Sequence, residues 1–386
     1  MTRRETDWEG VRLHVVTGKG GTGKTTVAAA LALALAADGQ TVLLCEVEGR
    51  QGISRLFDAP SLAYSERRIA TVRGNGQSAG THDPAGRGAT RPDHRRDTGH
   101  PGRPGHPARS DLSDVAGEVY GLAIDPEAAL TEYLELYYHM GRAARALDKV
   151  GAIDFATTIA PGVRDVLLTG KVYEAVRRKD KQRPSGGRPP DTRKAPRDRP
   201  TYDTVVLDAP PTGRIARFLG VTAGVADIAR VGPIRRQADA IMAMMRSPQT
   251  AVHIVTLLEE MPVQETADGL AELREAQIPV GGIVVNLAAR SPLDAQMRKA
   301  VAAGKLARAE FVDALTAAGL AADDGIVDGL LSDAAEHATR VALEDTLRAR
   351  ITELGRPTYE LPRLSDGIDI GGLFELAREL STQGMA

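Results

Sequence analysis

The chain has 386 residues, of which 42% are hydrophobic, a formal net charge of −2 and one cysteine, Cys45. Its length suits one large α/β domain with insertions or roughly two to three smaller domains. A single cysteine excludes a disulfide framework, a zinc site built on several thiolates and a three-thiolate arsenite site within one chain; it favours a reducing compartment, and we expect the cytoplasm.

The N-terminal region predicts a buried strand, a glycine-rich loop and a buried helix. The first ten residues are polar and do not resemble a secretory leader. A β-branched run at residues 13–17 precedes the loop, and an apolar stretch at 27–37 follows it. Because about 20 apolar residues are needed to cross a bilayer, we expect a buried helix here and no membrane-spanning segment in the chain.

Residues 18–26, GKGGTGKTT, fit the phosphate-binding pattern G-x-x-x-x-G-K-[ST] without a mismatch. The flanking strand and helix place backbone N–H groups and a helix N-terminus where phosphates bind. We expect Lys24 to reach the β- and γ-phosphates of a nucleotide and Thr25 to ligate Mg²⁺. The remaining cofactor-binding residues of this loop are Gly18, Gly20, Gly21, Thr22, Gly23 and Thr26.

A second lysine, Lys19, distinguishes this loop from an ordinary one. It lies next to the first glycine, from where it does not easily reach the phosphates that Lys24 contacts. We therefore expect Lys19 to point across an interface, towards a nucleotide held by a partner subunit.

The first part of the ATPase core, residues 1–72, ends at a segment of unusual composition. Between Arg73 and Asp111 there is no Val, Ile, Leu, Met or aromatic residue. Such a segment buries too little apolar surface to offset its ordering entropy, which predicts a disordered Gly/Pro/Arg insert at 73–114.

A second break at 178–201 is basic: residues 178–200 carry nine Lys or Arg against three Asp. It predicts a disordered loop.

Outside the inserts, strands alternate with helices. The expected strands lie at 13–17, 41–45, 204–207, 252–257 and 283–285. This alternation predicts a doubly wound, mostly parallel α/β sheet of the P-loop NTPase class. Residues 115–177 are expected to begin a helical subdomain, and 202–386 to complete the core with helical additions around 221–246.

Charge is distributed unevenly between the inserts and the body. The first insert carries seven Arg against five Asp, so the two inserts contribute +2 and +6, and the rest of the chain carries −10. An acidic body disfavours a nucleic-acid partner, which requires a basic face. The C-terminal run at 372–380 has an apolar face, but its two Glu against one Arg do not suit a membrane-surface helix.

Asp208 ends the expected strand at 204–207, where a carboxylate can hold Mg²⁺ through water. The continuation Asp208-Ala-Pro-Pro-Thr-Gly-Arg is similar to the DTAPTGH segment of the arsenical pump-driving and tail-anchored-protein targeting ATPases. The loop GKGGTGKTT resembles the deviant phosphate loop of the same dimerising class, and weaker similarity continues through 262–266 and 283–286. The chain is thus identified as a member of the ArsA-type ATPase family on these motifs.

The resemblance implies roles for several more residues. Pro210 and Pro211 have no N–H, so sensing of the γ-phosphate is left to Thr212 or Gly213, and we expect Gly213. Asn286 is expected to read adenine with its carboxamide, and Pro362 lies in a run similar to the loop that packs on the base. Glu48 occupies the position of the family's water-activating Asp; its extra methylene implies slow or partner-dependent hydrolysis.

The implied function is a Mg-ATP-binding and hydrolysing dimeric switch that acts on an unidentified client. The dimer is formed either by two copies or with a related ATPase. Two alternatives remain: a positioning ATPase like the partition and septum-site proteins, and a weakly hydrolysing ATP-binding subunit of a heterodimer with a paralogue. A client groove formed by Met242, Met244 and Met245 is weighed against simple core packing, which is favoured.

Overall fold

The computed structural model describes residues 7–73, 78–79, 115–138, 161–179, 200–220, 233–289, 291, 293–305, 308–365 and 367–386. Its centre is a sheet of nine strands in the order β4-β3-β5-β2-β6-β1-β7-β8-β9. The strands are β1 (Leu13–Gly18), β2 (Thr41–Glu46), β3 (Arg67–Arg73), β4 (Ser78–Ala79), β5 (Val115–Ala123), β6 (Thr204–Asp208), β7 (Thr250–Thr256), β8 (Val280–Ala288) and β9 (Thr358–Pro362). Neighbours from β5 to β9 in this order run parallel, whereas β3 is antiparallel to β5 and to β4. The predicted α/β class is confirmed.

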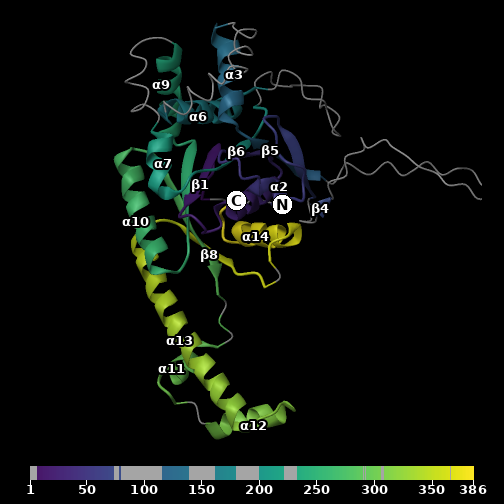
Figure 1. Ribbon diagram of the computed structural model, residues 1–386, viewed down its shortest axis with the longest axis vertical. Coiled ribbons are helices and arrows are strands. Elements are labelled where there is room, and N and C mark those ends of the chain that lie inside the picture. The colour runs from purple at the N-terminus through teal and green to yellow at the C-terminus, as the bar shows by residue number, and fades with distance from the viewer. Residues whose placement is uncertain are drawn as a thin grey trace, which may run out of the picture.

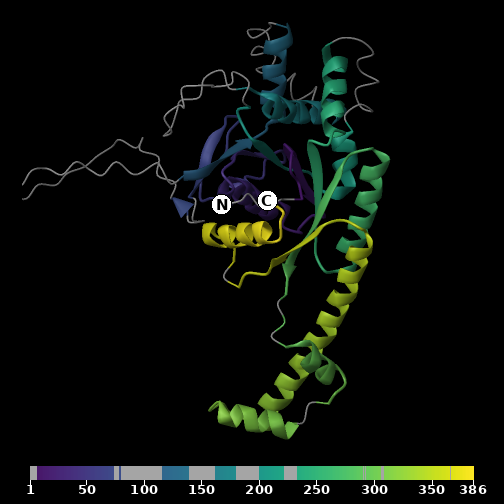
Figure 2. The ribbon, with the colours of Figure 1, turned by 180° about the vertical axis from the view of Figure 1, so that it is seen from behind.

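Helices cover both faces of the sheet (Figures 1 and 2). They are α1 (Lys24–Ala37), α2 (Gly52–Leu56), α3 (Pro126–Tyr138), α6 (Pro161–Arg177), α7 (Thr212–Leu219), α9 (Pro233–Met245), α10 (Glu260–Glu275), α11 (Ala295–Ala302), α12 (Arg308–Ala317), α13 (Asp324–Glu353) and α14 (Ile370–Thr382). One core cluster joins the sheet to α1, α2 and α14. The other joins it to α6, α7, α9, α10 and the C-terminal end of α13. Among the described helices, none is both long and apolar enough to cross a bilayer.

Helix α1 lies between the sheet and α14, which explains its composition. Every residue from 27 to 36 is buried, so the helix is apolar on all sides, as a fully enclosed helix must be. Its alternating Ala and Leu side chains allow close approach to both neighbours. Helix α14 buries only one stripe, formed by Leu373, Leu376, Ala377 and Leu380. The apolar face that the sequence shows at 372–380 is therefore occupied by packing against the chain itself.

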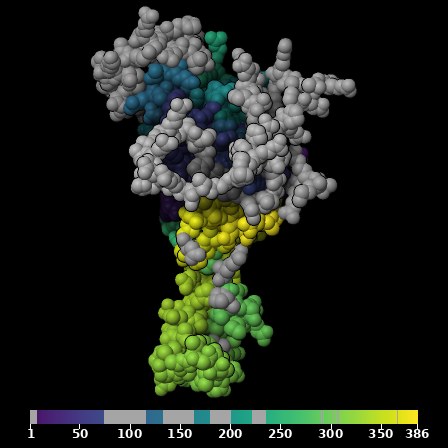
Figure 3. Space-filling model, turned by 90° about the vertical axis from the view of Figure 1, so that its right-hand side faces the viewer, coloured from purple at the N-terminus to yellow at the C-terminus, as the bar shows by residue number. Residues whose placement is uncertain are grey.

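A helical arm, formed by α11, α12 and the N-terminal half of α13, projects from the body (Figure 3). Helix α13 has 30 residues, a length of about 45 Å at 1.5 Å per residue. Its C-terminal end is anchored by Leu347 and Ile351, which are fully buried in the core. Towards the tip, α12 has no buried residue, and Leu320 and Ile326 are 60% and 42% exposed. The arm is thus held by few buried contacts.

The structure corrects the predicted boundaries around the first insert. Residues 115–123 form β5 inside the sheet, so the start of the range assigned to the helical subdomain, 115–177, belongs to the core sheet instead. Of the predicted insert at 73–114, Arg73 ends β3 and Ser78–Ala79 form β4; the remainder lies outside the described residues. Both β3 and β5 were missed because arginines and glycines interrupt their apolar alternation.

The second insert is described only at its ends. Arg178 forms ion pairs with Glu66 at 2.5 Å and Glu174 at 2.6 Å, and Lys179 makes an isolated bridge with Pro200. The rest of 178–201 lies outside the described residues, as does 221–232 of the predicted helical addition. In the described part of that addition, α9, Met242, Met244 and Met245 are buried in the core. The core interpretation of these methionines is confirmed and the groove interpretation is wrong.

Two buried histidines connect neighbouring strands on the α14 face of the sheet. The backbone N–H of Gly282 donates to His253 Nδ1 at 3.0 Å, so the proton of His253 lies on Nε2, which donates to His14 Nδ1 at 2.9 Å. Burial lowers the pKa of His14 to about 4 and that of His253 well below its ordinary value. Both rings are therefore neutral at physiological pH and act as polar parts of the core.

Candidate active site

The glycine-rich loop lies at the carboxyl end of β1, where ligands bind in open parallel sheets. Gly23 has φ 86° and caps α1, a conformation that glycine adopts without a steric penalty. A Cβ on Gly23 would lie 2.3 Å from Asn286 Nδ2, and one on Gly18 would lie 2.2 Å from the Val255 carbonyl oxygen. Both positions thus require glycine.

Hydrogen bonds hold the loop in shape. Thr22 Oγ1 donates to the Lys19 carbonyl oxygen at 2.9 Å, and Asn286 Nδ2 donates to the Thr22 carbonyl oxygen at 2.9 Å. Asn286 is 5% exposed, at the carboxyl end of β8. Its carboxamide therefore fastens the phosphate loop to the sheet, a role that sequence reasoning missed. Its expected reading of adenine stays a prediction.

Lys24 is a buried cation at the start of α1. Its ammonium donates to the Lys19 carbonyl oxygen at 3.3 Å, so it lies over the loop. Burial lowers the pKa of Lys24, and the nearby carboxylates of Asp208 and Glu48 act in the opposite direction. A buried ammonium among backbone N–H groups is suited to binding phosphate oxygens.

Thr25 and Asp208 meet beside Lys24, as the sequence predicts for the metal-binding pair. Thr25 Oγ1 donates to Asp208 Oδ2 at 2.6 Å, whereas Asp208 Oδ1 is buried and accepts no hydrogen bond from the described part of the chain. Burial raises the pKa of Asp208 to about 6, against the opposing effects of Thr25 and Lys24. A hydroxyl, a carboxylate and an unsatisfied buried oxygen fit a hard cation such as Mg²⁺.

Two glutamates follow β2 and have different surroundings. Glu46 pairs in register with Asp208, and its carboxylate accepts from the backbone N–H groups of Gly52 and Ile53, each at 3.3 Å. Glu48, the predicted water-positioning residue, is ion-paired with Arg50 at 3.5 Å and lies near enough to Lys24 to influence its pKa. Glu46 thus has a structural role at α2, and Glu48 faces the site.

Lys19 makes an ion pair within its own chain. Its ammonium lies 2.9 Å from Glu265 Oε1 on α10, and both side chains are 34% exposed. Sequence reasoning missed Glu265 as a partner, although it falls within the family-like run at 262–266. This ion pair, the one that Lys19 makes with a described residue, leaves Lys19 partly exposed beside the loop. That Lys19 contacts a second subunit stays a prediction.

The remaining predicted residues lie at the same edge of the sheet. Gly213 is exposed in the first turn of α7, immediately after the segment that follows Asp208. Pro362 ends β9 and pairs in register with Ala288, two residues beyond Asn286. The structure therefore brings the phosphate loop, Asp208, Gly213, Asn286 and Pro362 to one edge, while the functions of Gly213 and Pro362 stay predictions.

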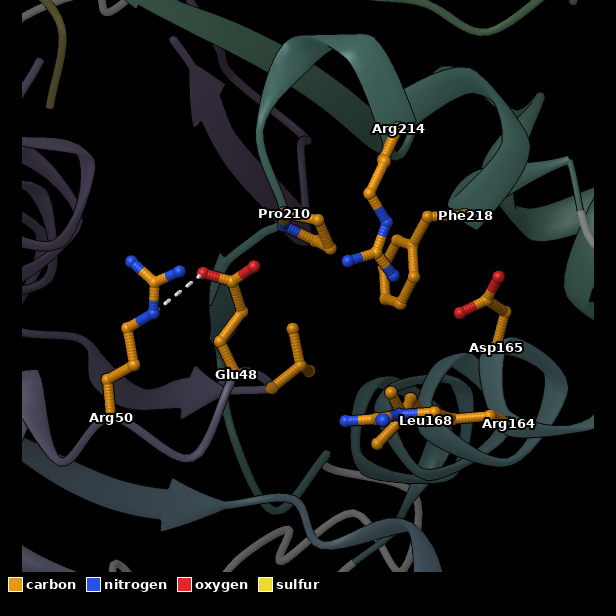
Figure 4. A pocket seen from close by; sticks show the side chains of 9 residues that line it. Glu48, Arg50, Arg164, Asp165, Leu168, Pro210, Arg214 and Phe218 are labelled. Atoms are coloured by element: carbon orange, nitrogen blue, oxygen red, sulfur yellow. Dashed lines mark ion pairs between the residues drawn. The ribbon is translucent and has the colours of Figure 1, made fainter. Parts of the chain in front are cut away.

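A cavity of about 210 Å³ opens beside this site (Figure 4). Glu48 and Pro210 form its wall on the active-site side, and α6 and α7 form the other walls. The Pro210 carbonyl oxygen accepts from Thr17 Oγ1 at 2.6 Å, which ties this wall to the end of β1.

Comparison with known proteins agrees with the geometry. Residues 13–312 match the CobQ/CobB/MinD/ParA nucleotide binding domain family. The chain is 44% identical over 376 residues to ATPase BagA of Mycobacterium tuberculosis strain H37Rv, covering 97% of this chain and 94% of the relative. The same identity and coverage relate it to the Mb3704 protein of Mycobacterium bovis. The chain belongs to the CobQ/CobB/MinD/ParA nucleotide binding domain family and is an ATPase of that family.

Proposed function

We propose that the protein is an ArsA-type, Mg-ATP-driven dimeric switch in which Lys19 of each copy contacts the nucleotide bound by the other. The observation that carries the proposal is the division of labour between two lysines of one loop. Lys24 is buried over its own loop, whereas Lys19 lies outside it and, among the described residues, forms an ion pair with Glu265 in which both side chains are about one-third exposed. A two-fold dimer would supply the same contact twice.

Within each site, the residues divide the work of phosphoryl transfer to water. Lys24 and the loop N–H groups neutralise and orient the phosphates, and Lys19 of the second copy adds positive charge where charge develops on the transferred group. Thr25 and Asp208 hold Mg²⁺, which when bound neutralises phosphate charge. Glu48 orients the attacking water, and the Gly213 N–H donates to the γ-phosphate.

Helix α7 is the element best placed to pass the state of the site to the rest of the protein. It begins four residues after Asp208 and packs against α6 and α10. Phe218 and Leu219 anchor it in the core. A displacement of Gly213 on loss of the γ-phosphate would therefore move α7 against two neighbouring helices, which supplies the coupling to a client.

Releasing Lys19 from its intramolecular partner should favour the dimer. Replacing Glu265→Gln removes the competing carboxylate from both copies. Because an exposed ion pair contributes about 0.2–1 kcal/mol and two pairs are released per dimer, dimer formation with a non-hydrolysable ATP analogue should rise about two- to thirtyfold. Lys19→Ala should weaken it. Sedimentation velocity measures both, with Glu272→Gln on the exposed side of α10 as the matched control. Equal dimer formation by Glu265→Gln, Lys19→Ala and Glu272→Gln would refute the role of Lys19.

The contact between Glu48 and Arg50 favours a second candidate, a weakly hydrolysing subunit that pairs with a paralogue. Arg50 forms an ion pair with the Glu48 carboxylate, which is the group expected to orient water. Turnover by the purified chain distinguishes the candidates: the dimeric switch hydrolyses ATP alone, whereas the second candidate requires the paralogue.

A further inference from the structure

The cavity beside the active site is lined by three arginines that come from three elements. Arg50 follows β2, Arg164 lies on α6 and Arg214 on α7. Figure 4 shows the guanidinium groups of Arg164 and Arg214 extending towards the same space as the Glu48 side chain. Such convergence from separate elements creates a local positive charge.

Two of these guanidinium groups lack an acceptor in the described part of the chain. The side chains of Arg164 and Arg214 form neither a hydrogen bond nor an ion pair with any described residue; the backbone N–H of Arg214 donates to the Pro211 carbonyl oxygen. Among the described residues, the Arg50 guanidinium group contacts only the Glu48 carboxylate, at 3.5 Å, and the Arg50 side chain is 75% exposed. The planar, multiply donating guanidinium group is suited to binding tetrahedral oxyanions.

The two carboxylates of the lining cancel this positive charge only in part. Glu48 is matched by Arg50, and Asp165 is 8% exposed and has no ion pair with a described residue. Burial raises the pKa of Asp165, while Arg214, Arg217 and Arg164 lower it. Three arginines against two carboxylates leave one net positive charge, and Leu168 and Phe218 provide an apolar wall that strengthens its effect.

The cavity adjoins the point at which hydrolysis occurs under the proposed function. Glu48 and Pro210 belong to both, and Pro210 comes two residues after Asp208. A phosphate that leaves on the side of Glu48 therefore enters a space lined by Arg164 and Arg214.

We propose that this cavity is an oxyanion subsite, separate from the phosphate loop, that binds a compact tetrahedral anion such as inorganic phosphate between Arg164 and Arg214. The anion comes either from hydrolysis in the adjoining site or from solution. Only the first source rests on the proposed function.

Binding is tested by titrating inorganic phosphate, by calorimetry, into protein saturated with Mg²⁺ and a non-hydrolysable ATP analogue, so that the loop is filled. The same titration on Lys24→Ala separates this subsite from the loop. The double variant Arg164→Gln/Arg214→Gln should weaken phosphate binding at least tenfold while retaining analogue binding. Arg217→Gln, on α7 like Arg214 but outside the cavity, should change the phosphate affinity less than twofold. The subsite is overturned if neither the wild type nor Lys24→Ala binds phosphate. It is also overturned if Arg217→Gln weakens phosphate binding as much as the double variant does.

The source of the anion is distinguished by following phosphate release in a single turnover with a fluorescent phosphate sensor. Faster release from the double variant, at an unchanged cleavage rate, assigns the bound anion to hydrolysis. Release at the wild-type rate from a variant that has lost phosphate binding assigns it to solution. Because the binding titration needs no turnover, failure of the proposed function does not affect it.

Discussion

Replacing Lys24→Ala should lower ATP turnover at least about 100-fold, the scale of loss for one preorganised group that stabilises developing charge. The ammonium is buried over the loop, and its described hydrogen-bond partner is the Lys19 carbonyl oxygen. Alanine removes the charge and leaves the surrounding helix intact, because alanine is the best helix former.

Steady-state phosphate release measures this loss, and the melting temperature shows that the variant remains folded. Lys299→Ala, an exposed lysine on the arm, is the matched control and should keep wild-type turnover. Turnover by Lys24→Ala within a few-fold of the wild type would show that this loop is not the catalytic phosphate site.

Asp208→Asn should have opposite effects on activity and on stability. Loss of the carboxylate removes the expected Mg²⁺ ligand, so magnesium-dependent turnover should fall about 100-fold. In metal-free buffer the variant should be more stable than the wild type at pH 8. Burial disfavours the charged form of Asp208 in the folded protein, with one oxygen left without a described partner. A shift of about two pKa units corresponds to a gain of about 3 kcal/mol.

The pH dependence of this effect has a defined sign. The pKa of Asp208 is about 6 in the folded protein, above its ordinary value of 3.8. The folded state therefore holds a proton that the unfolded state has lost, and the carboxylate reduces stability progressively as pH rises from about 4 to 6. The same proton competes with Mg²⁺, so turnover should decline below about pH 6.

Thermal unfolding in chelator across pH 4 to 8 checks the stability difference between Asp208→Asn and the wild type. The difference should grow up to about pH 6 and then stay constant. Asp239→Asn on α9, whose side chain is 56% exposed, is the control and should show a much smaller change. A constant difference across this range would contradict the raised pKa of Asp208.

The phosphate loop and its setting could be predicted from the sequence because they depend on local rules. Glycines at fixed spacing, a strand before them and an apolar helix after them specify the loop, and the strand ending at Asp208 completes the expected metal-binding pair. In the structure Thr25 Oγ1 lies 2.6 Å from Asp208 Oδ2, although the two residues are 183 positions apart in the sequence.

Contacts that depend on the tertiary fold could not be predicted in this way. Glu265 reaches Lys19 because α10 packs beside the loop, and two of the three arginines of the cavity, Arg164 and Arg214, come from α6 and α7. Strand β5 is a central strand whose glycines weaken the apolar pattern that identifies strands. In each case the deciding interaction lies between segments whose packing the local sequence does not encode.

The most direct test of the dimeric switch mixes two variants that are each defective in a different lysine. Lys19→Ala retains its own loop, and Lys24→Ala retains Lys19 for a partner. If Lys19 acts across a two-fold interface, half of the dimers in an equal mixture are mixed and each has one complete site, so turnover should reach about a quarter of the wild-type value. Turnover no greater than the mean of the two variants alone would contradict the account.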